Sequence, residues 1–180
     1  MALRTFGVQT LTGSAQPVLG DVLTAALPIP PDPTVDPIAT VANTALYQVG
    51  DRITVDPYQA NQDSYRVSRI LSATTMQLSL EGTQGHAHAT NAIIALAINS
   101  ADIVIQELDG NAAAIVIGSD NTVTSVPGGN ACYVLQKATS PTQANGFKLT
   151  NSTQGDNVNT ADLWVIGTAA DKYLAYALVI

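Results

Sequence analysis

The sequence predicts an all-β protein that is divided into two small β-domains. Only two of its 180 residues are glutamate and three are lysine, so it lacks the strong helix formers that exposed helical faces carry. It is rich instead in Thr, Val and Ile, which favour strands, and in Gly, Asn and Asp, which favour tight turns. Short runs of the first group alternate with clusters of the second, a pattern that is typical of barrels and sandwiches.

The first domain, residues 1–100, is predicted to begin with a β-hairpin. Residues 5–12 and 16–26 have the composition of strands, and Gly13-Ser14-Ala15 between them forms a turn-like cluster. Further short strands are expected at residues 38–41, 52–56, 65–71, 75–80 and 92–98. Strands of this length and spacing predict a barrel-like domain.

A proline-rich segment, residues 28–37, interrupts this domain. Its five prolines remove backbone donors and favour extended conformations, so neither a helix nor a central strand can run through it. Two interpretations stay open: a long surface loop, and an arm that lies across a neighbouring subunit.

The second domain, residues 101–180, is predicted to be a β-sandwich of jelly-roll-like type. Strands are expected at residues 103–108, 113–118, 122–126, 131–136, 146–150, 163–166 and 173–180. The turns between them contain glycine, asparagine and aspartate, which tolerate positive φ. This density of short strands is typical of a sandwich.

The last of these runs, residues 173–180, is apolar at nearly every position. A strand with one face in water should alternate apolar and polar residues. Both of its faces are therefore expected to be covered, either inside the domain or at a subunit interface.

Composition excludes several classes of partner. A net charge of −7 opposes direct contact with nucleic acid, which requires clustered lysine and arginine. The longest apolar run, residues 92–98, is too short to span a bilayer, and the N-terminus lacks the apolar stretch of a signal peptide. We therefore expect a chain that is made in the cytoplasm and spans no membrane. The single cysteine, Cys132, excludes an intrachain disulfide and a CxxC site.

Few residues have the spacing of a catalytic or metal-binding motif. His86 and His88 would share one face of a strand and either ligate zinc or lie in a turn, one satisfied and one exposed; we favour the turn. Asp51, Asp56 and Asp63 either gather a calcium ion or form turns, and turns are again favoured. No nucleotide-binding or zinc-protease motif is present, so we expect no enzyme, no cofactor and no metal.

Two sets of segments resemble modules of tailed-phage virion proteins. Residues 6–18, 49–56, 65–67 and 88–89 are similar to a small β-barrel module with a Val-Gly-Asp turn, an Arg-Val pair and a His-Ala segment. Residues 114–118, 146–149 and 162–172 are similar to a β-sandwich module of phage head and tail accessory proteins. The chain departs from the second pattern at Ala170, where glycine is usual, and by a longer insert at residues 141–145.

The resemblance implies a capsid decoration (cement) protein, located on the capsid surface of the virion, that binds the major capsid protein. A protein at a three-fold position of the shell would be a homotrimer. The residues expected at interfaces are Pro28, Pro30, Pro31, Pro33, Trp164, Tyr173, Tyr176 and Ile180. The alternatives are a tail adaptor or head-fibre component, and a module that binds host-surface glycans through its six tyrosines and Trp164.

Overall fold

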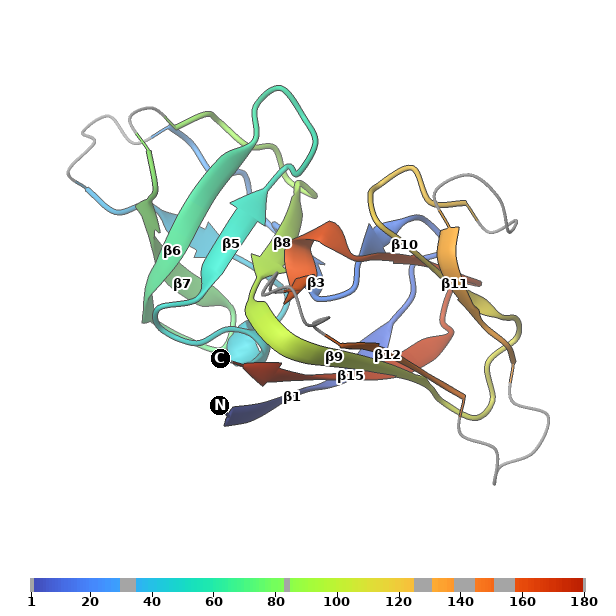
Figure 1. The fold of residues 1–180 in the computed structure, drawn as a ribbon. Coiled ribbons are helices and arrows are strands. Elements are labelled where there is room, and N and C mark those ends of the chain that lie inside the picture. The colour runs from blue at the N-terminus through green and yellow to red at the C-terminus, as the bar shows by residue number, and fades with distance from the viewer. Residues whose placement is uncertain are drawn as a thin grey trace. The chain divides into compact units, whose positions relative to one another are not determined.

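The computed structural model describes residues 2–29, 35–82, 85–124, 131–137, 145–150 and 158–179, without the side chains of residues 99–101, 131, 132, 150 and 158. It confirms an all-β chain with two units, drawn in Figure 1. Apart from two short 3₁₀ helices, η1 (Thr44–Leu46) and η2 (Thr160–Asp162), the regular elements of this part of the chain are strands.

The two units divide the chain differently from the predicted boundary at residue 100. The sandwich unit consists of Met1–Leu19 and Ile98–Ile180, and the inserted unit consists of Gly20–Ala97. The first 19 residues thus belong to the C-terminal unit. The reason is strand pairing over a long distance in sequence, because β1 (Ala2–Thr10) pairs antiparallel with β15 (Lys172–Val179) along nearly its whole length.

The sandwich unit contains two antiparallel sheets. One has the order β1-β15-β9-β12, with β13 also paired to β9, and the other has the order β11-β10-β14-β2. The bounds not yet given are β9 (Asn99–Glu107), β12 (Gly146–Thr150), β13 (Val158–Asn159), β11 (Ala131–Leu135), β10 (Ile115–Gly118), β14 (Trp164–Ile166) and β2 (Gln16–Pro17). Buried residues from both sheets form its core, among them Phe6, Ile103, Ile105, Ile115, Ile117, Trp164 and Tyr173.

The predicted N-terminal hairpin is wrong. Its first strand, β1, and its second, β2, belong to different sheets. The expected second strand is also divided at the unit boundary, because Gln16–Pro17 pairs with β14 whereas β3 (Gly20–Val22) pairs with β8 (Ile93–Ala97) in the inserted unit. Both predicted runs contain strand residues, although residues 11, 12, 18, 19 and 24–26 are outside the strands. Preference for strand does not choose the partner.

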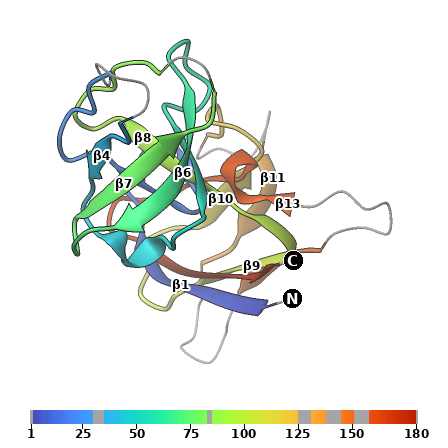
Figure 2. The ribbon, with the colours of Figure 1, turned by 90° about the vertical axis from the view of Figure 1, so that its left-hand side faces the viewer.

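The inserted unit is one curled antiparallel sheet, in agreement with the expected barrel-like shape. Its order is β3-β8-β5-β6-β7-β4, with β5 (Arg52–Val55), β6 (Asp63–Ile70), β7 (Thr75–Leu80) and β4 (Ile38–Thr40). The two ends of the sheet meet through a bridge between Leu23 and Val41, and the Thr24 amide donates to the Thr40 carbonyl at 2.8 Å. Figure 2 shows the curl of this sheet. The buried residues of the unit include Ile53, Val67, Met76, Leu78 and Leu96.

In the turn before β15, Ala170 adopts a backbone conformation that favours glycine. Ala170 has φ of 73°, in the left-handed region, and its amide donates to the Leu11 carbonyl at 2.9 Å. The strain of an alanine in this conformation is about 1–2 kcal/mol. Glycine avoids that strain, but it loses more backbone entropy on folding, and this loss offsets roughly half of the gain. The alanine is therefore held in a strained turn by its hydrogen bond.

Ala170→Gly is expected to raise the free energy of unfolding by about 0.5–1 kcal/mol, because glycine relieves the strain. Urea denaturation followed by circular dichroism measures the change. The neighbouring Ala169, also exposed but without positive φ, is the control: Ala169→Gly should lower the free energy of unfolding. Equal effects of the two changes would contradict the account of the turn.

Candidate interaction surface

The sheet β1-β15-β9 has an outer face that is rich in apolar side chains, opposite the face that lines the core. In β15 the inner positions Tyr173, Ala175 and Ala177 are buried, so the alternating positions point outward. The register places Leu3 beside Leu178, and Val8 beside Leu174. Together with Val104 of β9, which lies opposite Tyr176, these residues are the apolar part of the outer face: Leu3, Val8, Val104, Leu174, Tyr176 and Leu178. The same register places polar residues beside them on this face: Thr5, Thr10, Asp102, Gln106 and Lys172.

A β-bulge places Val8 on this face. Leu3 and Val8 are five positions apart, so a regular strand would direct them to opposite sides. The register shifts between Thr5 and Val8, and Gly7 within the shift has φ of 70°. As a result Phe6 is buried while Leu3 and Val8 share the outer side.

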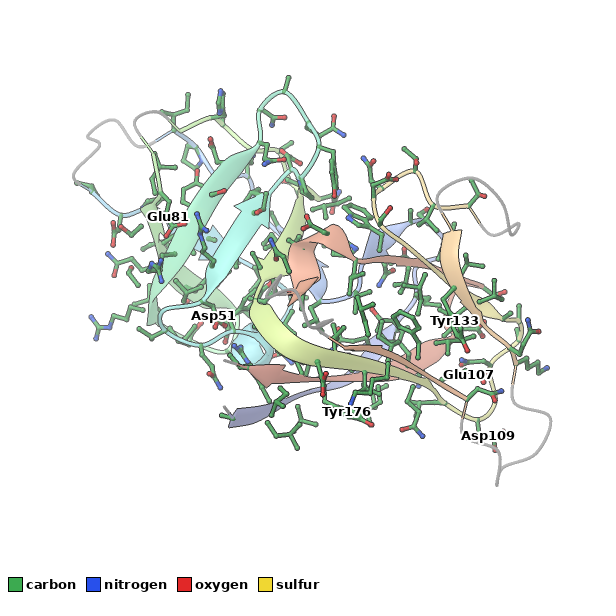
Figure 3. The ribbon with its side chains drawn as sticks, in the orientation of Figure 1. Asp51, Glu81, Glu107, Asp109, Tyr133 and Tyr176 are labelled. Atoms are coloured by element: carbon green, nitrogen blue, oxygen red, sulfur yellow. The ribbon has the colours of Figure 1, made fainter. Side chains whose placement is uncertain are left out.

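The outer face is exposed to solvent and carries little charge. Leu3 is 69% exposed and Val8 is 56% exposed, and the other four apolar residues are partly exposed. Its charged residues include Lys172 and also Asp102, which pairs with Lys148 of β12 at 3.0 Å. Figure 3 shows Tyr176 on the side of the sheet away from β10 and β11. A contiguous exposed apolar area of this kind is typical of a contact surface for protein.

The same face ends in an open strand edge. β1 is the end strand of its sheet, and no strand of the described residues pairs with its outer side. Ala2–Thr10 contains neither proline nor lysine, and the devices that it has against edge pairing are Arg4 and the bulge at Gly7. Backbone donors and acceptors therefore adjoin the apolar side chains.

Two of the expected interface residues lie in the core instead. Trp164 is 1% exposed and Tyr173 is 0% exposed, so neither can contact another subunit. The Tyr173 hydroxyl donates to the Val18 carbonyl at 2.7 Å inside the sandwich unit. A strand that is apolar at every position does not reveal which alternate set points inward, and this is why the sequence did not separate Tyr173 from Tyr176.

The remaining interface candidates are placed as follows. Tyr176 lies on the outer face, and Pro28 is exposed. Pro30, Pro31, Pro33 and Ile180 lie outside the described residues. Sequence analysis missed Leu3, Val8, Val104, Leu174 and Leu178, whose signal is their register in the sheet and not their spacing in the chain.

The histidines form a network with two aspartates in the inserted unit. The buried His88 ring has its Nδ1 2.9 Å from Oδ2 of Asp56 and its Nε2 3.0 Å from Oδ2 of Asp63. The exposed His86 ring has its Nδ1 2.8 Å from Oδ1 of Asp63, and its amide donates to Asp63 Oδ2 at 2.5 Å. The Tyr65 hydroxyl also donates to Asp63 at 3.2 Å.

This network has the character of a structural staple. The His88 ring lies between two carboxylates, so its two nitrogens link Asp56 to Asp63. The His88 backbone also exchanges two hydrogen bonds with Leu27, at 2.8 and 2.9 Å. The network thus ties the segment after β5, the start of β6 and the chain near Leu27 together.

The network does not converge on a metal position. Among the described residues, no group of three or more His, Cys, Asp or Glu side chains is placed to hold a metal ion. The rings of His86 and His88 both contact Asp63 and do not point toward a common position that an ion could occupy. The described residues therefore offer no set of zinc ligands around the two histidines. Asp51 is in a turn, where it accepts a hydrogen bond from the Gln48 amide at 2.7 Å.

No described helix has the length and hydropathy needed to cross a bilayer. Comparison of the chain with family models, with curated proteins and with solved structures finds no match.

Proposed function

We propose that the chain is a structural virion protein of a tailed phage, which decorates the capsid and stabilises it by binding the major capsid protein. The observation that carries the proposal is the outer face of the β1-β15-β9 sheet, which offers protein-contact chemistry instead of a reactive centre. The module resemblances of residues 6–18 and 162–172 supply the phage assignment. Binding the native lattice in preference to its loosened form stabilises that lattice by mass action.

A purely structural role also accounts for the polar groups that looked most reactive. The carboxylate of Asp63 is occupied by four hydrogen bonds, and both ring nitrogens of His88 have carboxylate partners. A general base or nucleophile needs an oxygen or nitrogen directed at a substrate. We therefore propose no enzymatic activity.

We assign the outer face to contact between copies of the chain in a homotrimer. Closed three-fold symmetry repeats one contact three times, and burying the apolar side chains of β1 and β15 would supply its free energy. We expect the inserted unit, with the proline-rich segment 28–37, to supply the capsid contact.

Leu3→Lys with Leu178→Lys is expected to convert the homotrimer to monomer, because two opposed outer-face residues become charged. Sedimentation velocity measures the mass, and circular dichroism should show an unchanged fold. Ile38→Lys is the matched control, because Ile38 is 56% exposed and lies in β4 of the inserted unit. A double variant that still sediments as a trimer would remove the outer face from the subunit contact.

The function itself is tested by quantitative mass spectrometry of purified virions, which counts this chain against the major capsid protein. Near-stoichiometric abundance is expected of a decoration protein. A dozen copies or fewer would favour a tail adaptor or head-fibre component, and absence from the particle would overturn the proposal. A glycan array tests the remaining alternative, a host-glycan module.

A further inference from the structure

The inserted unit gathers most of the arginine of the chain on one side of its sheet. The chain has four arginines, and three of them, Arg52, Arg66 and Arg69, lie on the adjacent strands β5 and β6. The register places Arg52 directly opposite Arg66. We call these three residues the arginine face.

A second β-bulge brings Arg69 to this side. Arg66 and Arg69 are three positions apart and would point to opposite sides of a regular strand. The register shifts between Val67 and Arg69, so Arg66 lies opposite Ser79 and Arg69 opposite Gln77, two alternating positions of β7. Met76 and Leu78, the positions between, are buried on the other side.

The arginine face has an excess of positive charge. Glu81 accepts hydrogen bonds from Arg52 Nε and, at 2.7 Å, from Arg66 Nη2. Burial raises the pKa of Glu81, but the hydrogen bonds from Arg52 and Arg66 outweigh burial and leave the pKa below its usual value. Three guanidinium groups against one carboxylate give a local charge of +2, in a chain whose net charge is −7.

Donor groups on this face remain available. Only the Nε of Arg52 donates a hydrogen bond to the described residues, and its side chain is 57% exposed. Arg66 donates from Nη2 to Glu81 and from Nη1 to the Gly50 carbonyl, the latter at 2.9 Å. Arg69 is exposed and makes no hydrogen bond or ion pair with the described residues. Like charges placed directly opposite on adjacent strands are unfavourable, and a further anion would offset that repulsion.

We propose that the arginine face binds an acidic segment of a partner protein, with one carboxylate at the free terminal nitrogens of Arg52 and a second at Arg69. Guanidinium groups match carboxylates in shape and can donate two parallel hydrogen bonds. The neighbouring Gln77 and Ser79 add uncharged polar groups to the same side. The inference goes beyond the proposed function, because it concerns the chemistry of a partner and stands whatever lattice the chain decorates.

The charge of the whole chain favours a short acidic peptide over nucleic acid. A nucleic acid is longer than this small basic area, so its other phosphates would be repelled by a protein whose net charge is −7. A segment with a few carboxylates is confined to the area of charge +2. Protein, not DNA or RNA, is therefore the class of macromolecule that fits this face.

The test is fluorescence anisotropy of the full chain with a labelled tetra-glutamate peptide at low salt. Arg69→Gln is expected to weaken binding about three- to fivefold, the effect of one exposed ion pair. Lys172→Gln makes the same change of charge in the sandwich unit and should leave binding unchanged. Glu81→Gln raises the local charge and should tighten binding, a result that damage to the fold would not produce.

Three results would overturn the proposal. The first is no binding of tetra-glutamate by the wild-type chain. The second is equal weakening by Arg69→Gln and Lys172→Gln, which would show a general effect of net charge. The third is tighter binding of a single-stranded oligonucleotide of the same length, which would assign the arginine face to phosphate.

Discussion

Trp164→Ala is expected to lower the free energy of unfolding of the sandwich unit by about 3–5 kcal/mol, the cost of removing a large buried aromatic side chain and leaving a cavity. Trp164 is 1% exposed and lies in β14 between β10 and β2. Urea denaturation followed by far-ultraviolet circular dichroism measures the loss, since the variant lacks the only tryptophan of the chain.

Tyr133→Ala is the matched control for this change. Tyr133 is 45% exposed in the same sheet and packs on Phe147 at 4.9 Å between ring centroids. Its removal should cost about 1 kcal/mol, since exposed aromatic pairs contribute little beyond their area. If Trp164→Ala altered only the oligomeric state, Trp164 would return to the subunit interface that the sequence predicted.

Asp63→Ala is expected to lower the free energy of unfolding by about 3–5 kcal/mol, because the four hydrogen bonds of the Asp63 carboxylate are lost and the buried Nε2 of His88 is left without this partner. The Asp63 side chain is 4% exposed, and that of His88 is 0% exposed. Asp109→Ala, a change of the same charge at an exposed turn residue, should be near neutral.

The same network makes a prediction for pH. Burial raises the pKa of Asp63, but hydrogen bonds from the His86 amide and from both histidine rings outweigh burial and leave the pKa below its usual value of 3.8. A lowered folded-state pKa contributes stability that is fully present above the unfolded value and is lost as the pH falls through the folded value. The wild-type chain should therefore lose stability below about pH 4.

Asp63→Asn should flatten this acid limb of the stability curve, and Asp109→Asn should keep it. Urea denaturation at a series of pH values compares the three proteins. An Asp63→Asn variant with the full acid dependence of the wild type would assign that dependence to other carboxylates.

The preferences of single residues for strand or turn were enough to predict the fold class. They were not enough to predict which strands pair, because that depends on contacts between residues far apart in sequence. The turn at residues 109–111 and the strands at 52–56 and 75–80 follow from glycine, asparagine and β-branched residues, and the structure has them within one or two positions. The pairing of β1 with β15 is not encoded by composition, because several strands have the same apolar character.

The candidate surface was harder to predict for a related reason. Val8 and Arg69 reach their faces only through bulges, which reverse the alternation that a sequence displays. The His-x-His motif and Asp56 and Asp63 were each visible in the sequence. Their assembly into one network required the pairing of β5 with β6 and the return of the chain to His88.

The pairing of β1 with β15 also sets an order for synthesis of the protein. The strands of the inserted unit are contained in Gly20–Ala97, so this unit has all of its strands once Ala97 has left the ribosome. β1 is made before the inserted unit, whereas its partner, Lys172–Val179, is made after it. The nascent chain therefore carries β1 without its partner while the inserted unit is made. This delay exposes the sandwich unit, more than the inserted unit, to aggregation during synthesis.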